Sequence, residues 1–213
     1  METAFTLLNY PISWIELIGT IAGLISVWLA VKNHVWTWPV GLLNVICFAV
    51  LFYHFRLYSD ALLQVYFFGM SLYGWYFWQQ KNGATASPIR VLDGQQRWLW
   101  AFIILAGTLV QGTLMSHVHT LLPTVFPEPA AFPYPDAFTT VASIIATFFL
   151  ARRVLESWVL WVLVDLVSIV LYFSKGIVLV GMEYVVFLGL ATAGGVGWYI
   201  SWRATTDHGP VYN

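Results

Sequence analysis

The amino-acid sequence predicts an all-α integral membrane protein with seven transmembrane helices. Of its 213 residues, 60% are hydrophobic and only 9% are charged, whereas soluble domains carry about 25% charged residues. The apolar residues gather into seven runs that are long enough, or nearly so, for a helix to cross a bilayer. Tryptophan and tyrosine mark many ends of these runs, which is typical of side chains anchored at the membrane interface.

Short polar segments and two longer loops separate the seven runs. We expect helices over residues 14–31, 36–53, 58–78, 98–115, 136–150, 158–173 and 177–202. The loop 81–97 is polar, and the loop 117–135 is rich in proline and predicted to be a stiff extended connector. His117 and His119 in the second loop are a weak metal signal, because no further ligand accompanies them.

The basic residues predict the orientation of the chain in the membrane. Seven of the nine Lys and Arg residues fall on the side opposite the N-terminus, and only Arg56 and Lys175 fall on the same side. Cytoplasmic loops are enriched in Lys and Arg. We therefore expect the N-terminus outside and the C-terminus in the cytoplasm, which agrees with an odd number of helices.

The first three predicted helices resemble the last three in sequence. A shift of 121 residues places Asn44 on Asp165, and a shift of 123 places Asp60 on Glu183 and segment 73–76 on 196–199. Two three-helix units with the same orientation need one linking helix between them. We therefore expect a 3+1+3 parallel repeat within a single membrane domain, 1–213: units 14–80 and 136–203, and linking helix 98–115. Parallel repeats are a transporter pattern, with the substrate site near the midplane between the halves.

The sixth predicted helix has one polar and aromatic face. Its members Trp158, Trp161, Asp165, Ser168 and Tyr172 follow each other at steps of three and four residues. An Asp in the middle of a span costs roughly 2.5–3.5 kcal/mol on insertion scales, so it usually faces a cavity or a partner. Asp165 either lines a cavity or bonds to a neighbouring helix, and the sequence leaves both roles open.

A cavity with acids, amides and many aromatic rings suits a flat, cationic aromatic ligand. Carboxylates supply charge, and ring faces supply stacking and cation–π attraction. Sugars also stack on tryptophan, so this pattern does not single out one ligand class. The sequence has no phosphate-binding loop, dinucleotide fingerprint, zinc-protease helix or nucleophile elbow. We therefore expect no enzyme, no cofactor and, without a basic patch, no nucleic-acid partner.

Several motifs are similar to those of the PnuC family of vitamin transporters. In the first half they are Trp14-Ile15-Glu16, Gly19 to Gly23, Gly41-Leu42-Leu43-Asn44-Val45, residues 57–58 and 62–68, and Tyr73-Gly74-Trp75-Tyr76-Phe77-Trp78. In the second half they are Arg152-Arg153, Glu156-Ser157-Trp158 with Trp161, Lys175-Gly176 and Glu183-Tyr184. The likeness covers about residues 14–80 and 136–203. It implies a 3+1+3 fold akin to the doubled three-helix unit of the sugar-transporting SWEETs.

The resemblance implies facilitated uptake of an unphosphorylated vitamin through the bacterial inner membrane. A cytoplasmic kinase would trap the vitamin and make uptake one-way, and the resemblance leaves a homo-oligomer open. The implied substrate-binding residues are Asn44, Gln64, Phe68, Tyr73, Trp161, Asp165, Tyr184 and Trp198.

Two features bear on the vitamin. Asp165 is acidic where some relatives of the nicotinamide riboside type have Asn, and residues 36–39 differ from the Asn-Tyr-Phe-Phe of those relatives. Both features favour thiamine, the substrate of the branch called PnuT, with nicotinamide riboside as the alternative. Outside the family, a non-transporting membrane receptor or a channel is the remaining alternative. A retinal photoreceptor is disfavoured because segment 177–202 has no Lys.

Overall fold

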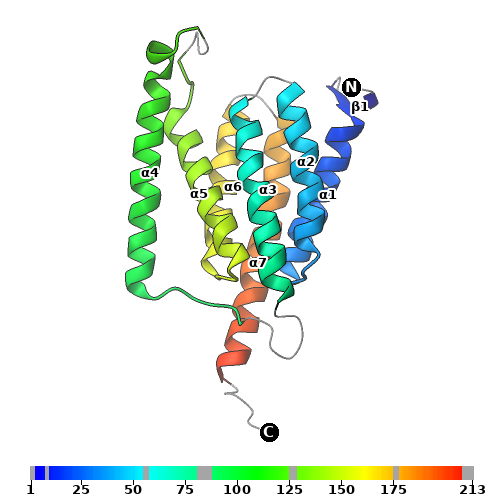
Figure 1. The fold of residues 1–213 in the computed structure, drawn as a ribbon, viewed down its shortest axis with the longest axis vertical. Helices are drawn as coiled ribbons and strands as arrows, with labels where there is room; N and C mark the ends of the chain where they lie inside the picture. The colour runs from blue at the N-terminus through cyan, green and yellow to red at the C-terminus, as the bar shows by residue number, and fades with distance from the viewer. Residues whose placement is uncertain are drawn as a thin grey trace.

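The computed structural model is a bundle of seven α-helices preceded by a two-stranded β-hairpin (Figure 1). The structure describes residues 3–7, 10–54, 58–80, 88–124, 129–174 and 178–207. The elements in order are β1 (Thr3–Leu7), β2 (Tyr10–Ser13), α1 (Trp14–Val31), α2 (Thr37–His54), α3 (Tyr58–Gln79), α4 (Gly94–Leu121), α5 (Pro133–Ala151), α6 (Glu156–Ser174) and α7 (Val178–Asp207). The all-helical membrane fold and the seven helices are confirmed.

Local sequence signals explain where several helices begin. Ser13 caps α1, because its hydroxyl accepts a hydrogen bond from the backbone N–H of Glu16 at 3.2 Å. Asp93 and Gln96 form a reciprocal capping box that starts α4. Pro133 stands at the start of α5, where its missing N–H leaves no intrahelical bond unmade.

The fourth helix is longer than predicted. The apolar run 98–115 marks the part that can cross lipid, whereas α4 begins at Gly94 and continues to Leu121. His117 and His119 therefore lie on a helix, and the prediction that they begin an extended connector was wrong. Polar residues extend a helix beyond the membrane without contributing to hydropathy, which is why an apolar run underestimates its length. The hairpin β1–β2 was not predicted either.

Six helices form a closed ring, and α4 lies outside it. Helices α1, α2 and α3 pack in chain order, and so do α5, α6 and α7; α3 then packs on α5, and α7 on α1. In the described part of the chain, the backbone of α4 approaches that of α5 but no other helix, its side chains also reach the start of α6, and it stands at the edge of the bundle in Figure 1. We call α1–α3 the first half, α5–α7 the second half, and their two meeting lines the α3–α5 seam and the α1–α7 seam.

The outer surface of the bundle is apolar. Helices α1, α4, α5 and α6, together with Gly181–Thr206 of α7, are long and apolar enough to cross a membrane, and α2 supplies a shorter apolar segment, Thr37–Leu51. Large apolar side chains such as Phe102 (67% exposed) and Val170 (67%) point outward, which lipid tolerates and water does not. The protein is therefore a multi-pass membrane protein, with its termini at opposite ends of the bundle (Figure 1).

Candidate substrate site

Four tryptophan rings fill the end of the ring at which α1 and α5 terminate. Trp38 meets Trp78 edge to face at 5.5 Å, Trp158 meets Trp198 edge to face at 5.6 Å, and Trp78 lies 6.1 Å from Trp198. All four are buried and share one apolar cluster that contains residues of both halves. We call Trp38, Trp78, Trp158 and Trp198 the tryptophan core; it closes this end of the ring.

The tryptophan core joins the halves through matching hydrogen bonds. The indole N–H of Trp78 donates to the carbonyl of Ala151 at 3.0 Å, and that of Trp198 donates to the carbonyl of Ala30 at 3.0 Å. Ala30 and Ala151 lie in the last turns of α1 and α5, where carbonyl groups have no intrahelical donor. The carbonyl of Ala30 also accepts a hydrogen bond from the backbone N–H of Asn33 at 2.9 Å. Each half therefore donates an indole hydrogen bond to a helix end of the other.

The packing beneath these rings also repeats. A Cβ atom at Gly74 would lie 2.5 Å from the ring of Trp38, and one at Gly194 would lie 2.6 Å from the ring of Trp158. Asn33 and Arg153, which end the turns after α1 and α5, both have φ of 54°. All these pairs are 120 residues apart. We propose that the halves form a parallel repeat with this register, in place of the register that aligned segment 73–76 with 196–199.

Asp165 lies in the middle of α6 and is only 3% exposed. No group among the described residues donates a hydrogen bond to its carboxylate. The hydroxyl of Tyr184 on α7 lies within electrostatic range of Asp165 and beside Ser168. The ring of Tyr184 stacks on Tyr172 at 5.4 Å and 14°. A buried carboxylate and a stacked aromatic pair therefore meet at the α6–α7 interface, where a bound cation would offset the cost of burying the charge.

Three other predicted site residues make contacts within the protein. The side-chain amide of Asn44 donates to the carbonyl of Gly19 on α1 at 2.9 Å. The hydroxyl of Tyr73 accepts a hydrogen bond from Arg152 at 2.6 Å. Trp198 is 1% exposed within the tryptophan core. These geometries favour structural roles, and contact with substrate stays a prediction for all three residues.

The remaining three predicted residues lie on two helices, α3 and α6. Gln64 on α3 is half-buried, and Phe68 on the same helix is 39% exposed. Trp161 on α6 packs against both buried apolar clusters of the protein. Their roles in binding stay predictions, as do those of Asp165 and Tyr184.

Two arginines at the α5–α6 turn were missed as contributors to this region. The guanidinium of Arg153 lies 4.4 Å from the ring centre of Trp78, and that of Arg152 lies 5.2 Å from the ring centre of Phe77. Burial lowers the pKa of Arg153, although a guanidinium stays charged in proteins. In the sequence the two arginines form a basic pair at the end of a predicted helix. This pair helped to predict the orientation of the chain in the membrane, but it did not reveal the aromatic rings that the arginines contact.

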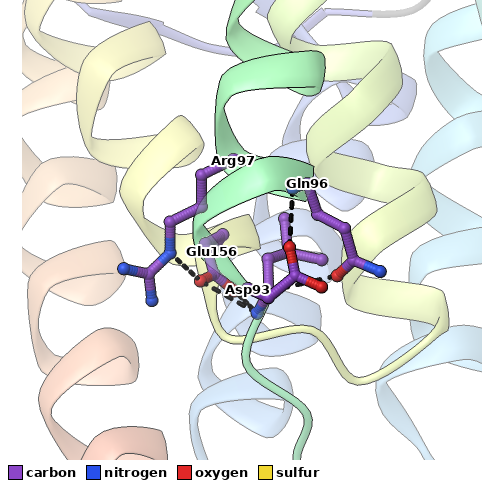
Figure 2. A network of polar contacts seen from close by, with 5 residues as sticks. Asp93, Gln96, Arg97 and Glu156 are labelled. Atoms are coloured by element: carbon purple, nitrogen blue, oxygen red, sulfur yellow. Dashed lines mark hydrogen bonds and ion pairs between the residues drawn. The ribbon is translucent and has the colours of Figure 1, made fainter.

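The chain between α3 and α4 docks on the same turn. Arg90 forms a parallel β-bridge with Val154. The carboxylate of Glu156 accepts hydrogen bonds from the backbone N–H of Leu92 at 3.1 Å and from Nε of Arg97 at 3.0 Å (Figure 2). We call this set of contacts the α3–α4 brace, because it ties the link between the halves to the second half.

Comparisons with known proteins agree with this architecture. Residues 13–200 match the family model described as "Nicotinamide mononucleotide transporter". The "Nicotinamide riboside transporter PnuC" of Escherichia coli (strain K12) is 32% identical over 212 residues, which cover 92% of this chain and 89% of that protein. The "Riboflavin/roseoflavin transporter RibM" of Streptomyces davaonensis is 32% identical over 210 residues, which cover 98% and 94%.

A solved structure shares the fold. "Crystal structure of the Vitamin B3 transporter PnuC" describes a protein that superposes with a TM-score of 0.67 at 21% identity, covering 90% of this chain and 83% of that one. The match of the family model extends over most of the chain, and two relatives reach 32% identity. The chain therefore belongs to the nicotinamide mononucleotide transporter family, which includes the PnuC proteins.

Proposed function

We propose that this protein carries an unphosphorylated, cationic vitamin across the bacterial inner membrane, with nicotinamide riboside as the first candidate. Membership of the family makes the protein a vitamin transporter. The observation that supports a cationic substrate is Asp165, a carboxylate 3% exposed in mid-helix without a hydrogen-bond donor in the described part of the chain. Charges placed this way inside membrane helices usually mark a substrate path.

The choice of vitamin combines this charge with the relatives. Nicotinamide riboside carries a positive charge on a flat pyridinium ring, thiamine carries one on a thiazolium ring, and riboflavin is neutral. The PnuC proteins of Escherichia coli and of Neisseria mucosa, the latter 26% identical, are named for nicotinamide riboside, and RibM for riboflavin. These relatives do not support the sequence-based preference for thiamine, and the charge of Asp165 disfavours riboflavin.

The transport path in this proposal runs between the two halves. The tryptophan core closes the end where α1 and α5 terminate, which the distribution of basic residues places on the cytoplasmic side. The N-terminus then lies outside, and a vitamin entering from outside reaches Asp165 before it meets the tryptophan core. A cytoplasmic kinase that phosphorylates the vitamin would prevent its return and would make a passive carrier accumulate it.

Binding to the purified protein tests the substrate and the role of Asp165 together. Isothermal titration calorimetry would be run with nicotinamide riboside, thiamine and riboflavin. We expect saturable binding of nicotinamide riboside that weakens at least about tenfold in Asp165→Asn, because hydrogen bonds and charge pairing to an ionised group contribute about 1.5–3 kcal/mol. Glu156→Gln is the matched control, since it removes the other carboxylate of α6 and should leave binding unchanged.

Each other outcome of the titration has a definite meaning. Preference for thiamine would keep the cationic site and change the vitamin. Tight binding of riboflavin, or unchanged affinity in Asp165→Asn, would contradict the proposed role of Asp165. A receptor would move no label across a vesicle membrane, and a channel would let the label equilibrate without saturation, whereas a carrier would accumulate it transiently by saturable counterflow.

A further inference from the structure

The α3–α5 seam is held by polar and aromatic contacts along its length. Halfway along it, the hydroxyl of Tyr66 donates to the carbonyl of Ile144 at 2.8 Å. At the end closed by the tryptophan core, Trp78 bonds to Ala151, and Arg152 donates to the hydroxyl of Tyr73. The arginine–ring contacts at 5.2 and 4.4 Å lie at the same end. The α3–α4 brace adds backbone hydrogen bonds beside this seam.

The helices of the α1–α7 seam pack as extensively as those of the α3–α5 seam, but fewer polar contacts hold them together. In the part of the chain that the structure describes, a single side-chain hydrogen bond crosses it, from Trp198 to Ala30. Toward the opposite end of the bundle, Glu16 of α1 and Glu183 of α7 lie within electrostatic range of each other. Like charges at this range repel. The α1–α7 seam, which corresponds to the α3–α5 seam in the proposed repeat, therefore has a similar indole hydrogen bond. Among the described residues it has no counterpart of the tyrosine and arginine contacts or of the α3–α4 brace.

This difference decides which seam separates first when the halves move apart. Each hydrogen bond stabilises the seam that it crosses, and hydrogen bonds to charged groups do so more strongly than neutral ones. Cation–π contacts add further attraction, which is largest where water is excluded. Packed elements move as rigid bodies about the contacts that persist. The better-attached seam is then the hinge, and the other seam is the one that opens.

We infer that the halves rock about the α3–α5 seam and that the α1–α7 seam opens to release substrate at the end closed by the tryptophan core. Arg152 and Tyr73 are then positioning residues of the hinge, and Trp198 is the latch of the opening seam. The inference depends on the proposed function only for the choice of substrate in the experiment, because we expect the α1–α7 seam to open also without a ligand.

The repeat supplies a matched pair of probes. Ala30 and Ala151 accept the indole bonds of Trp198 and Trp78 and are 1% and 0% exposed; they are 121 residues apart and so differ by one position from the 120-residue register. Ala30→Cys and Ala151→Cys would each be made in a Cys47→Ala background, which removes the only native cysteine. Labelling by a membrane-permeable maleimide reports how often each buried site opens. The rates would be measured without substrate first, and then with saturating nicotinamide riboside.

We expect Ala30→Cys to react about tenfold faster than Ala151→Cys without substrate, because opening exposes only the α1–α7 seam. Substrate should change the first rate and leave the second unchanged. Equal rates, or faster reaction of Ala151→Cys, would overturn the inference. If the first rate is faster but substrate changes neither rate, the hinge stands and the proposed substrate fails.

A second pair of variants covers the case in which a cysteine variant fails to fold. Trp198→Phe and Trp78→Phe each remove one indole N–H from the tryptophan core. Tryptic cleavage of inside-out vesicles after Arg203 on α7 would be followed for each variant. The inference predicts cleavage about threefold faster in Trp198→Phe than in Trp78→Phe, because the former loses the described hydrogen bond of its seam. The reverse order would contradict it.

Discussion

The two seams of the ring are built from helices that the proposed repeat makes equivalent, yet they are attached differently. Both use an indole that donates to the last turn of a helix in the other half, at 3.0 Å in each case. Among the residues that the structure describes, only those of the α3–α5 seam add a tyrosine bond, an arginine pair over rings and the α3–α4 brace. The packing within the two halves is thus similar, as the proposed repeat predicts, whereas the polar contacts between the halves differ at the two seams. In a carrier with this architecture, we expect the α3–α5 seam to act as the hinge.

The largest effect should come from filling the space beneath the tryptophan core, and it should be equal in the two halves. Gly74→Val and Gly194→Val each place methyl groups against a buried ring and should destabilise the protein by about 3 kcal/mol. Gly197→Val is the control, since a Cβ atom there meets nothing within 4 Å. Thermal unfolding in detergent checks this, and unequal losses at Gly74 and Gly194 would break the 120-residue register.

The next effect should separate the seams. Arg152→Gln removes the bond to Tyr73 and the contact with Phe77, and we expect it to cost about 1.5 kcal/mol. Lys32→Gln changes the equivalent, exposed residue of the first half and should cost almost nothing. Both values come from thermal unfolding. A Lys32→Gln variant as unstable as Arg152→Gln would mean that the α1–α7 seam has an attachment of equal strength.

A smaller effect should come from the middle of the hinge seam. Tyr66→Phe removes one hydrogen bond to the carbonyl of Ile144, which should lower the free energy of unfolding by about 1 kcal/mol. Tyr76→Phe on the same helix, where Tyr76 is 63% exposed, serves as the control and should have little effect. Equal stabilities of the two variants would show that the seam is not held at its middle.

The smallest effect should have the opposite sign. Glu16→Gln removes one member of the carboxylate pair across the α1–α7 seam and should stabilise the protein by about 0.5 kcal/mol, because repulsion between partly exposed charges is weak. Glu156→Gln also removes a carboxylate but loses the partner of Arg97, so it should destabilise. If Glu16→Gln destabilises as well, Glu16 has an attractive partner and the seam is stronger than inferred.

Helix positions were predictable from the sequence because apolar runs and interfacial aromatics are local signals. The bounds of α1 agree with the predicted 14–31, and α2 differs by one residue at each end. The hairpin and the polar ends of α4 were missed, since they carry no membrane signal. Hydropathy also cannot distinguish burial in lipid from burial in protein, so it could not show that α4 lies outside the ring.

The candidate site was less predictable. The stripe on α6 marked Asp165, because a charge in an apolar helix is visible in the sequence alone; the structure buries this residue, and its role in binding stays a prediction. A polar–aromatic pattern does not reveal partners far away in the chain. The partner of Trp198 is Ala30, 168 residues away, and the partner of Tyr73 is Arg152, 79 residues away. The sequence therefore predicted that both residues contact substrate. It could not reveal their contacts within the protein, because these contacts form only where the two halves meet.

The most direct test of cationic vitamin transport past Asp165 is counterflow in liposomes that contain only the purified protein. The liposomes would be loaded with unlabelled nicotinamide riboside and diluted into a trace of the labelled vitamin. We expect transient, saturable uptake of label by the wild-type protein, which Tyr76→Phe at an exposed position retains and Asp165→Asn largely loses. Absence of exchange by the wild-type protein, or undiminished exchange by Asp165→Asn, would contradict the proposed function.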